Sequence, residues 1–131
     1  ETPTLYGRQF IWGVFDCFTF IRDWYEQEYG IVIPAAKYAE KFWERGEELY
    51  LDNFESAGFV EVSMSEIQYG DIVLLDLVGG VTSHAGVYLG DNIIAHHIEG
   101  RLSSRDCYGQ FYMDRTTKIV RHNDRLNAEK N

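Results

Sequence analysis

The sequence is poor in basic residues. Its 131 residues include 12 Lys and Arg against 21 Asp and Glu, which gives a formal net charge of −9. Nucleic acids and anionic membranes are bound through clustered Lys and Arg, and the chain has no such cluster. It also lacks an apolar run near 18 residues and a charged-then-apolar leader. We therefore expect a soluble domain with no nucleic-acid partner and no membrane span. The start at Glu1 leaves open whether it is a piece of a longer protein, and localisation stays open with it.

Cysteine is scarce as well. The only two, Cys17 and Cys107, lie far apart and form no CxxC or other metal-type spacing, so we expect no metal site and no cofactor. A disulfide between them is optional in a domain with a sizeable core, and we expect none.

Apolar residues, in contrast, are plentiful. Hydrophobic residues make up 45% of the chain and aromatic residues 15%, enough for one domain to bury a core. We expect a single domain over residues 1–122. The polar segment 123–131 is predicted to be a tail that frays.

The clearest helix signal lies at residues 16–29. Apolar residues recur there with the 3.6-residue period, Asp16 is a favoured N-cap, and Gly30 is a favoured residue after the last turn. A second helical region is predicted over residues 36–57, with a break near Gly46 and an end at Gly58.

The pattern changes to alternation from Phe59 onward. Strands are predicted at 59–62, 72–77, 81–89, 92–98 and 117–121, with a helix at 103–113. Gly90-Asp91 between the third and fourth strands is typical of a tight hairpin. Helices followed by consecutive strands favour an α+β fold in which N-terminal helices pack on an antiparallel sheet.

Cys17 follows the predicted N-cap and is the first residue of the helix. The free N–H groups and the macrodipole there favour a thiolate, and the Cys17 N–H is available to an oxyanion. The alternative is that Cys17 is a small buried apolar residue, as most free cysteines are. A nucleophile also needs a base.

The best candidate base among the four histidines is His84, at the start of a strand. Pairing about the hairpin turn aligns residues whose numbers sum to about 180, which puts His96 opposite His84. By alternation His96 and His97 face opposite sides of the sheet. A second ring could hold the tautomer of the first, as a cysteine nucleophile requires. A zinc site on these rings would lack a third ligand. We expect His122 to be solvated, and Cys107 to be an inert thiol within a helix.

These residues together resemble the NlpC/P60 family of papain-like cysteine peptidases. The similarity lies in Phe10-Ile11-Trp12-Gly13, in Asp16-Cys17, in Gly70-Asp71-Ile72-Val73-Leu74, in His84-Ala85-Gly86-Val87-Tyr88-Leu89-Gly90, and in His96 twelve positions after His84. The order and spacing of these motifs cover nearly the whole chain.

A narrower resemblance is to the NlpC/P60 domains of the tail tips of lambda-like phages. It lies in Arg22-Asp23-Trp24-Tyr25, His96-His97 and Gly100-Arg101-Leu102-Ser103. It implies a place in a virion tail tip, other tail tip proteins as partners, and action in the bacterial cell wall. The alternatives are a structural tail tip module with little or no catalysis, and a secreted bacterial wall hydrolase or effector.

The family resemblance implies an endopeptidase that cleaves peptidoglycan stem peptides, commonly at the D-γ-glutamyl–diaminopimelate bond, without a metal. Carried over to this sequence, Cys17 is the nucleophile, His84 the base and His96 the orienting residue. The oxyanion site and groove would involve the Cys17 N–H, Phe10, Trp12, Asp16, Phe18 and Tyr6.

The sequence departs from the family in three ways near the cysteine. Trp12-Gly13 leads almost directly into Asp16-Cys17, where a longer loop is frequent. Phe18-Thr19 stands where Ser-Gly is usual, so the groove wall is bulkier. Phe10 stands where a tyrosine is frequent, which leaves Tyr6 as a nearby source of a hydroxyl.

Overall fold

The fold is built on a six-stranded antiparallel sheet with the strand order β1-β6-β2-β3-β4-β5. The structure, a computed structural model, describes residues 4–38, 40–78 and 80–130, with side chains up to residue 126. The strands are β1 (Phe59–Val62), β2 (Ile72–Leu75), β3 (His84–Tyr88), β4 (Ile93–His96), β5 (Ser104–Cys107) and β6 (Thr116–His122). The helices are α1 (Cys17–Tyr29), α2 (Leu49–Ser56), α3 (Gln110–Arg115) and α4 (Asn123–Lys130), with 3-10 turns at Phe42–Arg45 and Met64–Glu66.

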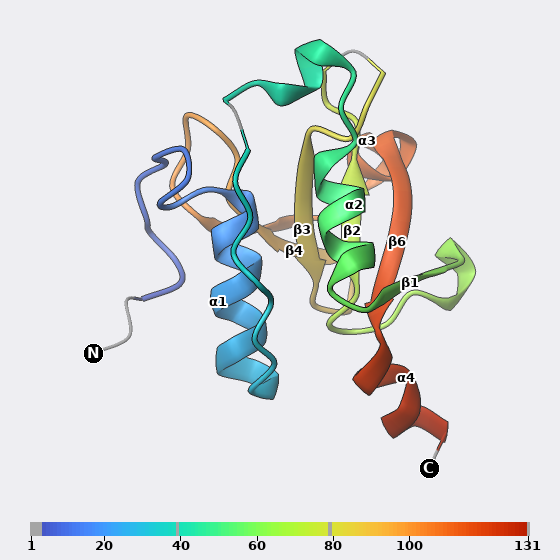
Figure 1. The fold of residues 1–131 in the computed structure, drawn as a ribbon. Coiled ribbons are helices and arrows are strands. Elements are labelled where there is room, and N and C mark those ends of the chain that lie inside the picture. The colour runs from blue at the N-terminus through green and yellow to red at the C-terminus, as the bar shows by residue number, and fades with distance from the viewer. Residues whose placement is uncertain (1–3, 39, 79, 131) are drawn as a thin grey trace.

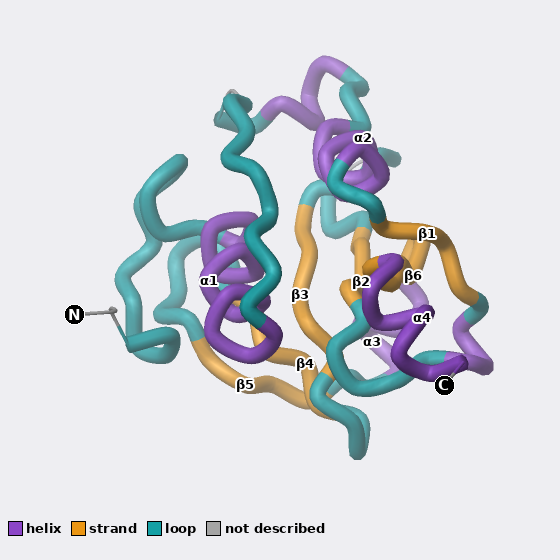
Figure 2. The backbone as a smooth tube through the Cα atoms, turned by 60° about the horizontal axis from the view of Figure 1, so that its bottom comes forward, coloured by secondary structure: helices purple, strands orange, loops and turns teal. Residues whose placement is uncertain are grey.

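Helices cover both faces of this sheet. α1 packs on β3 and β4, and α2 packs on β1 (Figure 1). Both helices contribute to the larger core cluster, whose β2 members are Ile72 and Leu74. The alternate residues Val73 and Leu75 face the other way, into a second cluster that includes Tyr112 of α3. Figure 2 shows α1 lying over the part of the sheet that curves from β3 to β5. The predicted α+β architecture is confirmed.

The first helix forms where its end signals predict it. Asp16 is the N-cap in a reciprocal capping box with Thr19, and Gly30 ends the helix with φ 68°, in the left-handed region. The face that carries Phe20, Ile21 and Tyr25 is fully buried, as the 3.6-residue period predicts.

A glycine in β3 allows the β3–β4 pair to pack closely. Gly86 is paired with His96, and a Cβ atom on Gly86 would lie 2.7 Å from Ile94 side-chain atoms and 3.0 Å from the His96 Cβ. Contacts this short would force β4 to move, so the absence of a side chain at residue 86 sets the position of His96.

The helix predicted at residues 103–113 is wrong for its first half. Ser104–Cys107 forms the edge strand β5, paired with β4, and α3 starts only at Gln110 after the N-cap Gly109. Strand pairing along the free edge of β4 outweighs the local helix propensity of this segment.

The helical region predicted over residues 36–57 is longer than the one observed. Among the described residues of this range, only the turn Phe42–Arg45 and α2 are helical. The break predicted near Gly46 is present, since the turn is bounded by Lys41 and Gly46, both with positive φ.

The other predicted strands differ from the observed strands at most in their bounds. β1 has the predicted bounds, whereas β2, β3 and β4 are shorter than predicted and β6 is longer. The polar segment for which we expected fraying forms α4, whose Arg125 guanidinium stacks over the Tyr29 ring. Within the described residues, no helix is long and apolar enough to span a bilayer.

Candidate active site

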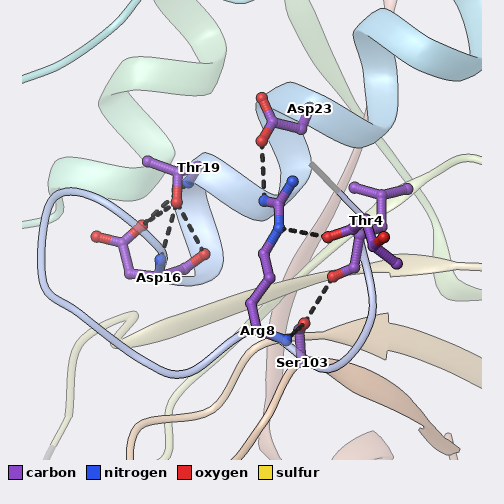
Figure 3. A network of polar contacts seen from close by, with 7 residues as sticks. Thr4, Arg8, Asp16, Thr19, Asp23 and Ser103 are labelled. Carbon is purple, nitrogen blue, oxygen red and sulfur yellow. Dashed lines mark hydrogen bonds and ion pairs between the residues drawn. The ribbon is translucent and has the colours of Figure 1, made fainter. Parts of the chain in front are cut away.

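Hydrogen bonds to the buried residue Asp16 hold the N-terminus of α1. Its carboxylate accepts from the N–H of Gly13 at 2.8 Å, the N–H of Thr19 at 3.0 Å and the hydroxyl of Tyr38 at 2.5 Å. Figure 3 shows Asp16 and Thr19 facing each other across the first turn. Asp16, predicted as a groove residue, is fully buried. It positions the backbone around Cys17 and forms no part of the groove wall.

A second polar network fixes the segment before α1 (Figure 3). The buried Arg8 guanidinium forms an ion pair with Asp23 at 2.8 Å, and its Nε donates to the Thr4 carbonyl at 2.8 Å. The Arg8 N–H donates to the Ser103 hydroxyl at 2.9 Å. Arg8 therefore joins the N-terminal segment, α1 and the chain that leads into β5.

The Cys17 sulfur lies in the core beside the start of β3. The residue is only 3% exposed. Burial and the Asp16 charge raise the pKa of the thiol to about 12, against the lowering effects of the Tyr50 hydroxyl and the Ala85 N–H. The predicted thiolate is therefore wrong for this conformation, because desolvation exceeds the stabilisation that the helix N-terminus provides.

His84 and His96 form a hydrogen-bonded pair. The His84 Nε2 and His96 Nδ1 atoms are 2.9 Å apart, and both residues are buried. Burial and the neighbouring His96 lower the pKa of His84 well below its ordinary value. The His84 ring is thus neutral, as the Cys17 thiol is. The predicted contact between the two histidines is present.

The predicted strand register, however, is wrong by two residues. His96 is paired with Gly86, so it lies diagonally from His84 on the same face. The turn between β3 and β4 is longer than the predicted turn Gly90-Asp91. Asn92 also belongs to it, and both Asp91 and Asn92 adopt positive φ there. The two rings still meet, since diagonal neighbours on one sheet face are within reach.

The structure brings Cys17 next to His84 without joining their side chains. Ala85 packs in the same cluster as Cys17, and its N–H lies at the sulfur. Alternation then puts the His84 ring on the other face of β3. Among the described residues, the sulfur has no hydrogen bond to the His84 ring, and the His84 Nδ1 atom has no hydrogen-bond partner. The sulfur therefore lies at the amide that links His84 to Ala85.

The remaining candidate residues lie elsewhere. His97 packs edge-on against Phe10, with ring centroids 5.1 Å apart, and its Nε2 lies 3.1 Å from the Arg101 carbonyl oxygen. His122 is half-buried and packs against the Phe59 ring, so it is less solvated than expected. Cys107 is exposed on β5, and both cysteines are free.

Two of the predicted groove residues line a cavity of about 640 Å³. Phe10 and Trp12 form part of its wall, and the Trp12 indole N–H donates to Glu99 at 3.2 Å. Phe18 does not contribute, because it is 1% exposed and packs on Tyr50 in the core. Tyr6 lies on a different cavity, of about 360 Å³.

Two residues beside the predicted site were not predicted from the sequence. Tyr50 of α2 has a buried hydroxyl that acts on the Cys17 thiol. Asp106 of β5 lies 3.5 Å from the His96 Nε2 atom. Ser104-Arg105-Asp106 are three consecutive polar residues without polar–apolar alternation, so the sequence gives no clear signal for the strand that holds Asp106. Nothing local in the sequence points to Tyr50.

The described residues form no metal centre. Nowhere in residues 4–38, 40–78 and 80–130 do three or more His, Cys, Asp or Glu side chains gather closely enough to hold an ion.

Fold and site together define a class. A cysteine begins a helix that packs on an antiparallel sheet, and a pair of histidines lies on the neighbouring strands. Residues 7–121 match the model of the NlpC/P60 family, and the chain therefore belongs to this family.

Comparison with curated proteins finds relatives in two phages. The chain is 40% identical to tail tip assembly protein K of Escherichia phage lambda over 120 residues, which cover 92% of this chain and 60% of that protein. It is 34% identical to tail tip assembly protein K of Escherichia phage N15 over 128 residues, which cover 95% and 51%. The chain thus spans between half and three-fifths of these relatives.

Solved structures share the fold. The NlpC/P60 domain of peptidoglycan hydrolase SagA superposes with a TM-score of 0.63 at 24% identity, covering 89% of each chain. An NlpC/P60 family protein from Bacillus cereus superposes with a TM-score of 0.61 at 21% identity, covering 93% of this chain and 41% of that one.

Proposed function

We propose that this domain is a cysteine endopeptidase that hydrolyses peptidoglycan stem peptides, at the D-γ-glutamyl–diaminopimelate bond. The observation that carries the proposal is the buried His84–His96 pair, 2.9 Å apart, on the two strands β3 and β4 against which the helix of Cys17 packs. Membership of the NlpC/P60 family supports it. The fold is also that of a domain named as part of a peptidoglycan hydrolase.

In the proposed reaction the Cys17 sulfur attacks the carbonyl carbon of the scissile amide. The thiol proton passes to the His84 Nδ1 atom, and His84 then gives a proton to the amine that leaves as the C–N bond breaks. Water attacks the resulting thioester with His84 as base, which releases the acid and restores the thiol. His96 orients His84 throughout.

The protonation states in the structure determine how this reaction starts. Because burial favours the neutral thiol and the neutral imidazole, the proton moves from Cys17 to His84 during the attack and not before it. For this transfer the Cys17 sulfur must also leave the Ala85 N–H and come within reach of the His84 Nδ1 atom, which requires a rearrangement at the start of β3 and not only a turn of the Cys17 side chain. The Cys17 N–H at the start of α1 stabilises the oxyanion, and one such donor contributes on the order of 3 kcal/mol.

The proposed setting is the tail tip of a phage, where the enzyme opens the cell wall locally. Both curated relatives are named tail tip assembly proteins, which supports this setting and other tail tip proteins as partners. A secreted bacterial hydrolase or effector with the same chemistry is the alternative setting.

One observation favours a second function, a structural tail tip module with little catalysis. The Cys17 sulfur is almost completely enclosed, and it has no hydrogen bond to the His84 ring in the described part of the chain. In a phage that carries this domain, a structural module predicts unchanged plating after Cys17→Ala, whereas an enzyme needed for entry predicts reduced plating.

The deciding experiment is mass analysis of muropeptides after digestion of purified peptidoglycan with wild-type protein and with Cys17→Ala. The proposal predicts that wild type releases fragments cut after D-γ-glutamate and that the variant, with an unchanged melting curve, releases none. If wild type and variant give the same profile, the endopeptidase assignment fails for that wall type.

A further inference from the structure

On the face of the sheet that holds His84 and His96, a third polar side chain, Asp106, lies next to His96. We propose that Asp106 is a positioning residue that fixes the tautomers of His96 and, through it, of His84, so that the His84 Nδ1 atom carries a lone pair. This inference rests on the proposed function for its catalytic consequence, whereas the tautomers themselves can be observed without any activity.

Strand pairing places Asp106 beside His96. β4 and β5 are paired with Ile94 opposite Asp106 and His96 opposite Ser104, so Asp106 and His96 are diagonal neighbours on one face. The His96 Nε2 atom lies 3.5 Å from the Asp106 Oδ2 atom, a direct polar contact that is longer than an ordinary N–H···O hydrogen bond.

Three further groups hold the Asp106 carboxylate in this position. The Cys107 N–H donates to Oδ1 at 2.8 Å, and the Tyr112 hydroxyl donates to Oδ2 at 3.0 Å. The Arg101 guanidinium lies 4.0 Å from Oδ2. Tyr112 also packs edge-on against the His96 ring, with centroids 5.5 Å apart.

These contacts keep Asp106 ionised. Partial burial by itself raises the pKa of Asp106, but the hydrogen bonds from the Cys107 N–H and the Tyr112 hydroxyl, together with His96, outweigh it and hold the pKa below its usual value. Burial lowers the pKa of His96 to about 4, although Asp106 acts in the opposite direction. A neutral ring therefore faces a charged carboxylate at neutral pH.

The proton positions follow from the number of hydrogens available. An ionised carboxylate can only accept, so the single ring hydrogen of neutral His96 belongs on Nε2. The His96 Nδ1 atom is then an acceptor, and the His84 Nε2 atom 2.9 Å away must be the donor. The His84 Nδ1 atom is left without a hydrogen, which is the state that a base for Cys17 needs.

Asp106→Asn is expected to move the hydrogen of each histidine ring to its other nitrogen. The Cys107 N–H can only donate, whereas the Tyr112 hydroxyl can also accept, so the amide oxygen stays at the Oδ1 position and the amide NH₂ takes the Oδ2 position facing His96. An N–H donor at this place moves the His96 hydrogen to Nδ1 and, in turn, the His84 hydrogen to Nδ1. The base would then be blocked.

The experiment records long-range ¹H–¹⁵N spectra of the ring nitrogens in wild type and in Asp106→Asn, with kcat and KM on a soluble stem tetrapeptide. We expect hydrogen on Nε2 of both rings in wild type and on Nδ1 of both in the variant. We also expect kcat to fall by roughly 100-fold or more with little change in KM. Asp114→Asn, which removes the same charge from the exposed face of α3, is the control and should match wild type in both measurements.

Hydrogen on Nδ1 of either ring in wild type overturns the inference, even if Asp106→Asn does not fold. Unchanged tautomers or unchanged kcat in a folded Asp106→Asn also overturn it. If wild type cleaves no stem peptide, the proposed function fails, but the spectra still decide the role of Asp106.

Discussion

At the scale of single residues, burial determines the chemistry of Cys17. The position after an N-cap was visible in the sequence and suggested a thiolate, but the sequence does not show how many side chains close over the sulfur. Tyr50 comes from α2 and Ala85 from β3, and both reach Cys17 only in the folded chain. The place of Cys17 at the start of α1 was therefore predictable from the sequence, whereas the protonation state of its thiol was not.

This enclosure predicts unequal alkylation of the two cysteines. In native protein at neutral pH we expect iodoacetamide to modify the exposed Cys107 at least about 10-fold faster than Cys17, because a buried thiol with a raised pKa supplies almost no thiolate. Peptide mass mapping of a time course measures both rates, and unfolding in urea should bring them together. Equal rates in the native protein would show that the sulfur is accessible and ionised.

His96 makes stability depend on pH in a direction that can be worked out. Burial lowers its folded pKa from the usual 6.5 to about 4, so the folded state binds fewer protons between these values. The stabilisation is complete above about pH 6.5 and is lost as the pH falls toward 4. We expect His96→Gln to reduce the loss of unfolding free energy between pH 7 and pH 5 by about 2 kcal/mol. Urea unfolding at both values measures it, and equal losses in the two proteins would contradict it.

At the scale of elements, features that depend on residues close together in the sequence were predicted better than features that depend on distant residues. The capping residues Asp16 and Gly30 lie within the helix that they bound, so α1 was predicted correctly. β5 was taken for a helix because its strand character comes from pairing with β4. The register of the β3–β4 hairpin depended on two positive φ angles at Asp91 and Asn92, which the sequence only hints at.

Close packing of β3 and β4 predicts a sensitive position at Gly86. Gly86→Ala would bring a methyl group within 2.7 Å of Ile94 and 3.0 Å of the His96 Cβ. We expect a loss of about 1–3 kcal/mol in stability, together with reduced cleavage because His96 is displaced from His84. Gly109→Ala is the comparison: its φ is −98° and the added methyl group would lie 3.3 Å from the Cys107 sulfur, so we expect only the smaller loss, about 1 kcal/mol or less, that alanine brings at an N-cap. Equal thermal melts for both variants would contradict this packing argument.

At the scale of the whole molecule, the site is assembled from segments far apart in the chain. Arg8 fixes the N-terminal segment to α1 and to the chain before β5, which also carries the groove residues Glu99 and Arg101. The motifs predicted that His84 and His96 meet on one face of the sheet. They did not predict Asp106 or the core position of Phe18, because both depend on how β5 and α2 are placed.

The central claim is that Cys17 and His84 act as one catalytic unit, although their side chains are not bonded to each other in this conformation. The most direct test measures the rate of muropeptide release by wild type, Cys17→Ala, His84→Gln and the double variant. We predict that each single variant loses cleavage and that the double variant is no slower than either, because residues that act as a unit are not additive. Retained cleavage in His84→Gln, or effects that multiply in the double variant, would contradict the claim.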